Sequence, residues 1–194
     1  MHIYHQGLNK IDTLNELKES INKALDEKNF FLAMFLAVGI PDICSAMLKT
    51  NNKGNKARYI AWIEEFIQKR VLNLDDEQKK RDIVHLETPL YYLIRNSIIH
   101  EASSNFIINK EEKCFKIKEF IFFAPLYDEK IPLWSSCDIF SVESSDEEND
   151  IKNIEVQINV YRFCYLIICG MEQFIKFYKE QINGRKPSFN IYIY

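Results

Sequence analysis

Apolar side chains in the first half of the chain recur at spacings of three and four, which is the period of an α-helix. The first such stripe predicts a helix over about 12–28, with Asp12 or Thr13 as its N-cap. The residues of this stripe are Leu14, Leu17, Ile21 and Leu25. Similar stripes predict helices over about 56–70, 87–102 and 160–181.

A very apolar segment, Phe30 to Val38, follows the first predicted helix. Gly39 and Pro41 then interrupt it, and Pro41 suits the first turn of a new helix. We therefore predict that one helix ends near Val38 and that another runs from Pro41 to about Lys49. The two would form a buried hairpin in the centre of the protein.

After Ser103 the pattern changes to the alternation that is typical of β-strands. Segments 106–108 and 115–123 flank a charged turn and predict a hairpin, and segments 138–142, 154–158 and 189–194 predict further strands. The sequence therefore predicts a mainly α protein that forms a single domain over 1–194. Its helical core covers about 12–102 and 159–182, and a small antiparallel β-rich insertion covers about 103–158, between the fourth and last helices.

Composition narrows the class of protein. Of the 194 residues, 47% are hydrophobic and 27% are charged, as in soluble globular proteins. A net charge of -3 is too neutral for a non-specific nucleic-acid coat but permits a local basic pocket. Because the N-terminus lacks the layout of a secretory signal and no run of 18 apolar residues occurs, we expect a cytoplasmic protein that does not contact a membrane.

The chain contains five cysteines and no CxxC pair. This pattern fits reduced thiols in a cytosolic protein better than a disulfide framework. Cys44, Cys164 and Cys169 lie in apolar helical stretches, where cysteine usually serves as a small buried hydrophobic residue.

The helix predicted over about 87–102 carries polar residues in an otherwise apolar segment. Arg95 and Asn96 are followed, after three residues, by His100. Asn96 and His100 are one turn apart and share a face, whereas Arg95 lies about 140° from His100 around the axis and can reach around with its long side chain. Imidazole can transfer protons near neutral pH, and guanidinium can stabilise negative charge on phosphate oxygens.

The segment from Arg95 to His100 resembles the Arg-polar-x₃-His motif of the HEPN superfamily. The segments Gly39–Cys44 and Arg58–Trp62 are similar to those of a family of uncharacterised bacterial proteins, and the resemblance covers about 12–105 and the last helix. It implies a HEPN-like helical bundle and a metal-independent endoribonuclease. In such an enzyme the ribose 2′-OH attacks the neighbouring phosphorus and leaves a cyclic phosphate. The implied biological role is that of a toxin or a phage-defence protein.

The resemblance also implies roles for individual residues. His100 would act as general base or acid, Arg95 would stabilise charge on the phosphorus oxygens, and Asn96 would orient His100 or a phosphate oxygen. Because one imidazole cannot easily make both proton transfers of an in-line displacement, the resemblance implies a homodimer whose two motifs share a cleft. It implies RNA as substrate, an antitoxin or regulatory protein as partner, and no cofactor. Ala102 is a departure, because HEPN toxins paired with a nucleotidyltransferase antitoxin often carry Tyr there.

The same polar residues have other interpretations. Arg95, Asn96 and His100 could form a network that fixes helix packing, or could bind a ligand without turnover. A non-catalytic HEPN-like module for ligand binding or protein interaction is therefore the alternative function.

Basic residues near the third predicted helix are candidate RNA contacts. Lys53, Lys56 and Arg58 could form a basic rim, although the charge pattern favours a solvated surface. His2 and His5 lack partner cysteines or carboxylates at ligand spacing, so we expect no metal site.

Overall fold

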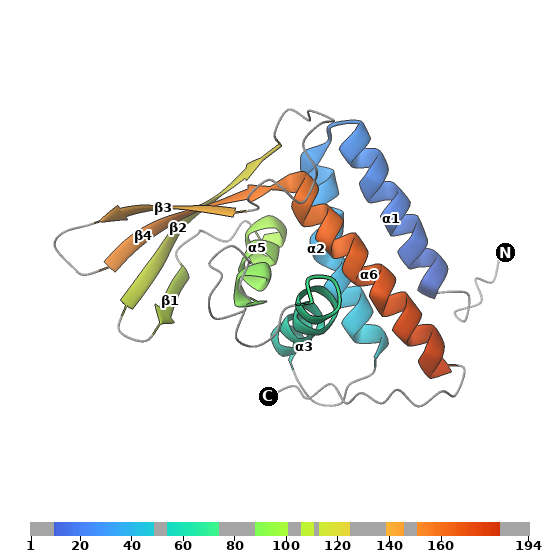
Figure 1. Cartoon of the computed structure of the whole chain (residues 1–194). Coiled ribbons are helices and arrows are strands. Elements are labelled where there is room, and N and C mark those ends of the chain that lie inside the picture. Colours follow the sequence, from blue (N-terminus) through green and yellow to red (C-terminus); the bar gives the residue numbers. More distant parts are fainter. Residues whose placement is uncertain are drawn as a thin grey trace. The chain divides into compact units, whose positions relative to one another are not determined.

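The computed structural model describes residues 10–48, 54–73, 88–100, 106–110, 113–124, 139–145 and 151–182. These residues form mainly helices together with a small sheet, as predicted (Figure 1). The helices are α1 (Lys10–Asp26), α2 (Phe30–Met47), α3 (Asn55–Trp62), the π-helix η1 (Ile63–Lys69), α5 (Thr88–His100) and α6 (Val160–Ile182). The strands are β1 (Phe106–Lys110), β2 (Lys113–Phe123), β3 (Ile139–Ser145) and β4 (Ile151–Asn159).

The chain divides into two compact units. The first unit contains α1, α2, α3, η1 and the part of α6 from Leu166 onwards. The second contains α5, the sheet and the first residues of α6, up to Tyr165. The candidate motif on α5 therefore belongs to the unit that carries the sheet.

In the first unit, α1, α2 and α6 lie side by side (Figure 1). The predicted stripe of α1 faces the core, since Leu14 and Ile21 are buried and Leu17 and Leu25 are half-buried. Lys18 of α1 forms an ion pair with Glu172 of α6. The predicted start of α2 is also confirmed, because Asn29 Oδ1 accepts a hydrogen bond from the backbone N–H of Leu32 at 3.2 Å, as an N-cap does.

The predicted break at Gly39 and Pro41 is wrong. α2 is one helix of 18 residues with Pro41 inside it, so the predicted hairpin does not form. A proline within a helix removes one backbone hydrogen bond. Here Ile40, Pro41 and Cys44 are all buried, and their packing offsets that loss, so tertiary contacts override the local breaker signal.

The length of α2 bears on the expectation of no membrane contact. By length and composition alone α2 could cross a bilayer, and it is the only such helix among the described residues. Half of it is buried inside the protein, a property that core helices of soluble proteins share. The helix alone therefore assigns the protein to neither environment.

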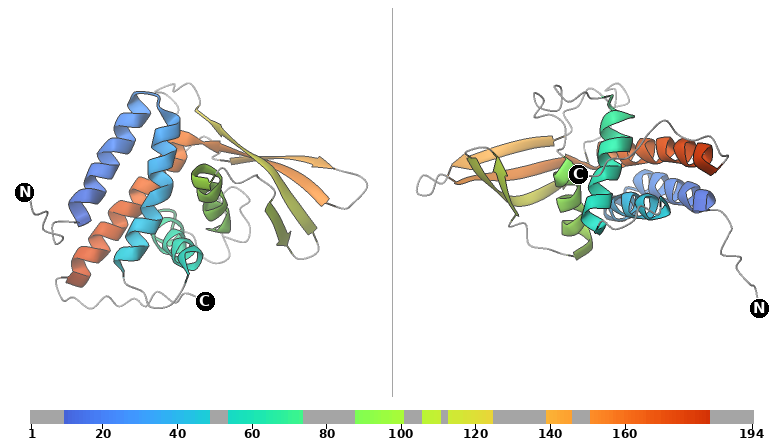
Figure 2. Two further views of the ribbon diagram at one scale, coloured as in Figure 1. Left: turned by 180° about the vertical axis from the view of Figure 1, so that it is seen from behind. Right: turned by 90° about the horizontal axis from the view of Figure 1, so that it is seen from below.

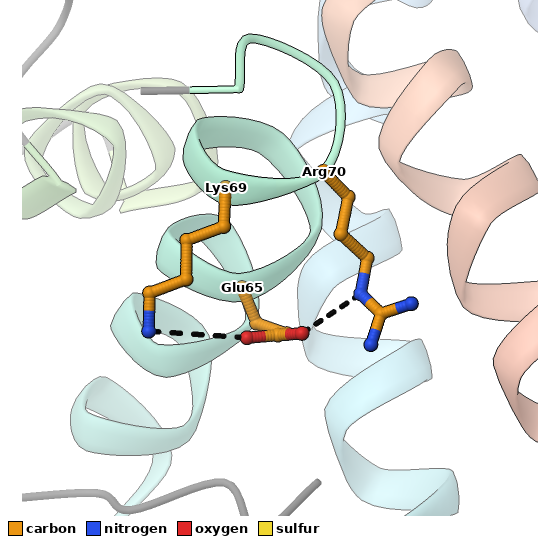
Figure 3. A network of polar contacts seen from close by, with 3 residues as sticks. All are labelled: Glu65, Lys69 and Arg70. Atoms are coloured by element: carbon orange, nitrogen blue, oxygen red, sulfur yellow. Dashed lines mark hydrogen bonds and ion pairs between the residues drawn. The ribbon is translucent and has the colours of Figure 1, made fainter. Parts of the chain in front are cut away.

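The predicted helix over about 56–70 changes type midway. It is α-helical in α3 and continues as the π-helix η1. A π-helix has a wider turn than an α-helix, and four consecutive residues, Glu65 to Gln68, are buried here. The wider turn also brings Arg70 beside Glu65, five positions earlier, with 2.7 Å between Arg70 Nε and Glu65 Oε1 (Figure 3).

The sheet has the strand order β1-β2-β4-β3 (Figure 2). The predicted hairpin is confirmed, because β1 and β2 pair antiparallel with Lys110 opposite Lys113. The prediction that the insertion is antiparallel is wrong, because the central strands β2 and β4 run parallel. Alternation predicts strands but not the direction in which they pair. The strand predicted over 189–194 lies outside the described residues.

Two glycines inside helices have opposite surroundings. A Cβ on Gly170 of α6 would lie 2.9 Å from Ile67 Cγ1 and 3.0 Å from Trp62 Cη2, whereas a Cβ on Gly39 would meet no atom within 4 Å. We expect Gly170→Ala to lower the free energy of unfolding by about 1–2 kcal/mol, because the methyl group overpacks a closed contact. Gly39→Ala should raise it by about 0.5–1 kcal/mol, because alanine favours helix. Urea denaturation at low protein concentration measures both, and equal signs would contradict the prediction.

Candidate functional site

One side of α5 is anchored by two buried residues. Tyr91 and Ile94 are both buried, and the Tyr91 ring stacks on that of Phe163, at the start of α6, with 5.6 Å between ring centroids. Pro89 suits the first turn of α5, because the N–H that it lacks would have no acceptor within the helix. These contacts fix α5 within the second unit.

Asn96 lies away from this anchored side, and Arg95 lies on its flank. With about 100° between successive residues, Asn96 lies nearly opposite the mean direction of Tyr91 and Ile94, and Arg95 lies on the flank between them. Both side chains are half-buried. The guanidinium and the amide are therefore held against the protein and still reached by solvent.

Two of the described residues contact the Arg95 guanidinium. Its Nη1 donates a hydrogen bond to Asn96 Oδ1 at 3.0 Å. Its central carbon lies 5.8 Å from the centroid of the Tyr92 ring, within the range of a cation–π contact. Asn96 therefore orients Arg95, a role that the sequence did not predict for it.

His100 is the last residue of α5, and its side chain lies outside the part of the chain that the structure describes. Its position follows Asn96 by one helical turn. The contact predicted between Asn96 and His100 stays a prediction, as does the catalytic role of each. Between them, Ser97 Oγ donates a hydrogen bond to the carbonyl oxygen of Ile94 at 2.8 Å.

Only part of the predicted basic rim lies within the described residues. Lys53 lies outside the described residues, Lys56 is exposed, and Arg58 is half-buried and donates a hydrogen bond from Nη2 to Asn55 Oδ1. Lys56 and Arg58 belong to the first unit, whereas Arg95 belongs to the second. The predicted rim and the predicted catalytic residues therefore lie on different units.

Over the described ranges, no group of three His, Cys, Asp or Glu side chains is arranged to hold a metal ion. Among the described residues, Cys44, Cys164 and Cys169 are not in disulfides; Cys44 and Cys164 are buried, as predicted, and Cys169 is half-buried. Burial raises the pKa of the Cys164 thiol to about 12, from its usual value near 9.0, and raises that of Cys44 as well. Both therefore stay protonated, and hence poor nucleophiles, near neutral pH.

We expect Cys44 and Cys164 to resist alkylation by iodoacetamide at pH 8 in the folded protein, because the thiolate is the reactive form. Peptide mapping by mass spectrometry, with and without urea, measures each site. Cys169 is the internal comparison and should react before Cys44 and Cys164. Rapid labelling of Cys164 without urea would contradict the burial of this thiol.

Comparisons with models of protein families, with curated proteins and with solved structures find no match to this chain. What the structure defines is a mainly helical protein with a small mixed sheet, in which α5 carries a paired arginine and asparagine.

Two features of the first unit were not predicted from the sequence. One is the contact between Glu65 and Arg70, for which a spacing of five residues gives a signal only if a π-helix is expected. The other is the exposure of Phe31 and Phe35 on α2. Because α2 contains a single charged residue, Asp42, its sequence offers no polar face to indicate which side meets solvent.

Proposed function

We propose that this protein is a metal-independent endoribonuclease of HEPN type, which cleaves RNA by transesterification of the 2′-OH to a cyclic phosphate. One observation carries the proposal. α5 holds Asn96 on the side away from its buried residues and Arg95 on the flank, and the two side chains are joined by a 3.0 Å hydrogen bond. A guanidinium in that position is suited to the phosphorus oxygens, because its planar donors match the geometry of a phosphate.

In the proposed reaction, His100 removes the proton from the ribose 2′-OH as the oxygen attacks phosphorus. Arg95 stabilises the charge that develops on the non-bridging oxygens, and Asn96 keeps the guanidinium in place. The 5′-oxygen leaves with a proton that a second imidazole donates. Since two imidazoles are needed on opposite sides of an in-line displacement, the proposed enzyme is a homodimer in which each protomer contributes one motif.

The proposed role as a toxin or phage-defence protein in the cytoplasm rests on the HEPN resemblance alone. So does the proposed control by an antitoxin or regulatory protein. Lys53, Lys56 and Arg58 remain proposed RNA contacts. Of these, Lys56 supports the proposal best, because its side chain is exposed.

The test is incubation of the purified protein with single-stranded RNA in EDTA. We expect cleavage that leaves 2′,3′-cyclic phosphate and 5′-OH ends, identified by mass spectrometry. Absence of cleavage with and without added divalent cations would overturn the proposal, as would cleavage that requires a metal.

A second candidate function, a non-catalytic protein-interaction module, is supported by a different observation. Phe31 and Phe35 of α2 are exposed and stack with 6.3 Å between ring centroids. Exposed apolar surface of this kind often marks sites of protein interaction. Binding of a partner without any RNA cleavage would favour this candidate.

A further inference from the structure

Tyr92 places an aromatic ring at the candidate site on α5. It precedes Asn96 by four residues, and Asn96 precedes His100 by four, so the three positions follow one another along the helix. Tyr92 is half-buried, and the centroid of its ring lies 5.8 Å from the central carbon of the Arg95 guanidinium. A ring and a guanidinium therefore lie side by side where the proposed cleavage takes place.

These residues share one side of the helix. At about 100° per residue, Arg95, Tyr92, Asn96 and His100 span an arc of about 140° that excludes the two buried residues of α5. Ile99 is half-buried and lies within the same arc. We call these five residues the α5 face. It offers apolar surface as well as polar groups.

The two adjacent tyrosines of α5 have different surroundings. Tyr91 is only 2% exposed, and its ring stacks on that of Phe163. Tyr92 is reached by solvent and contacts a charged group. Tyr91 therefore supplies the aromatic packing that anchors α5, whereas Tyr92 presents part of its surface on the α5 face.

The chemistry of this pair matches two parts of a single nucleotide. A guanidinium is suited to phosphate oxygens, and an aromatic side chain is suited to the face of a nucleobase. The 5.8 Å between the Arg95 guanidinium and the Tyr92 ring is comparable with the separation of base and phosphate within one nucleotide. With a phosphate against Arg95, the base joined to it by the ribose reaches Tyr92.

The state of the RNA follows from the same geometry. In a duplex each base is stacked between its neighbours, so an aromatic side chain reaches only a base that has left the stack. In-line attack also needs the 2′-oxygen opposite the leaving 5′-oxygen, an arrangement that the regular A-form helix does not provide. Single-stranded RNA meets both requirements.

We propose that Tyr92 stacks on a base of the RNA substrate and that the site therefore takes single-stranded RNA. The proposal deepens the proposed function and rests on it for the choice of RNA. The stacked base fixes the nucleotide whose phosphate Arg95 contacts, so Tyr92 is a substrate-binding residue. Because every base offers an aromatic face, this contact selects unpaired RNA and not a particular base.

The test measures binding without cleavage. The probe is a short fluorescent single-stranded RNA with fluorine in place of every 2′-OH, which cannot undergo the transesterification. Fluorescence anisotropy at one fixed salt concentration gives its dissociation constant, and a duplex of the same sequence is measured alongside. We expect Tyr92→Leu to weaken binding of the single strand about 5–150-fold, the range for losing one stacked base. Tyr92→Phe keeps the ring and should stay within about twofold of the unchanged chain.

Tyr165→Leu is the matched control. Tyr165 also lies beside an arginine, with 5.9 Å between its ring centroid and the central carbon of Arg162, but this pair is on α6. The control should bind the single strand as the unchanged chain does, and circular dichroism establishes that each variant is folded.

Three results would overturn the proposal: no binding of the single strand by the unchanged chain, a duplex bound as tightly as the single strand, or a folded Tyr92→Leu variant that binds normally. Binding that depends on Tyr92, with no cleavage of ordinary RNA, would support the stacking contact and remove the proposed enzyme. Cleavage of ordinary RNA together with normal binding by Tyr92→Leu would do the reverse.

Discussion

Replacing Arg95 with alanine is expected to lower the rate of RNA cleavage about 10²–10³-fold, the cost of losing one donor that stabilises a developing oxyanion. The loss should appear in kcat more than in KM, because the charge on the phosphorus oxygens increases in the transition state. Single-turnover cleavage of a short fluorescent RNA measures the chemical step directly. Arg95→Lys should restore only part of the rate, since a lysine cannot form the planar paired contact with phosphate.

Two further variants distinguish a catalytic role from a structural one. His100→Ala should lower the cleavage rate about 10²–10⁴-fold, the usual contribution of a general acid or base. Ser97→Ala on the same helix removes only a bond to the backbone and should retain the full rate. An Arg95→Ala protein that is folded and as active as the unchanged chain would remove Arg95 from the mechanism.

Asn96 provides a sharper test of geometry. Its Oδ1 accepts the hydrogen bond from Arg95, so Asn96→Ala should loosen the guanidinium without removing it. We therefore expect a smaller loss of rate than for Arg95→Ala. In the double variant Arg95→Ala with Asn96→Ala, the second change should cost almost nothing, because residues that act as a unit are not additive.

The helical pattern of the sequence was sufficient to place most elements, and it failed where packing decides. The stripe of α1 and the caps at Asn29 and Asn159 follow from local rules; Asn159 Oδ1 accepts the N–H of Arg162 at 3.2 Å. Gly39 and Pro41 are strong local breakers, yet α2 continues through them because one half of the helix is packed into the first unit. The parallel pairing of β2 with β4 depends on the path of the chain, which alternation does not encode.

The positions of the candidate residues on their helix could be predicted from the sequence, whereas the hydrogen bond between Arg95 and Asn96 could not. Spacing alone placed Arg95 on a flank of its helix and Asn96 on the same face as His100, and the structure shows Arg95 and Asn96 half-buried. The bond between these adjacent residues depends on the rotamer that each one adopts. Sequence spacing carries no information on rotamers, so the predicted partners of Asn96 did not include Arg95.

Replacing Arg70 with alanine is expected to lower the free energy of unfolding by about 2–4 kcal/mol. Only 5% of the Glu65 side chain is exposed, and the Nε of Arg70 lies 2.7 Å from its carboxylate (Figure 3). Lys69 Nζ is 4.0 Å away and is a weaker partner. Without Arg70, a buried carboxylate loses its close hydrogen bond. Two cation–π contacts are lost as well, because the guanidinium carbon lies 5.4 Å from the Phe66 ring centroid and 5.2 Å from that of Phe177.

Urea denaturation can separate these contributions. Arg70→Met keeps an apolar stem against the two rings and removes the charge, so it isolates the cost of leaving Glu65 without its partner. Lys69→Met is the matched control and should cost less than about 1 kcal/mol, since that pair is long and the lysine is exposed. Combining Glu65→Met with Arg70→Met should recover much of the stability, because an apolar pair no longer carries a buried charge. If Arg70→Met lowered the free energy of unfolding no more than Lys69→Met does, the ion pair between Glu65 and Arg70 would contribute nothing to the stability of the fold.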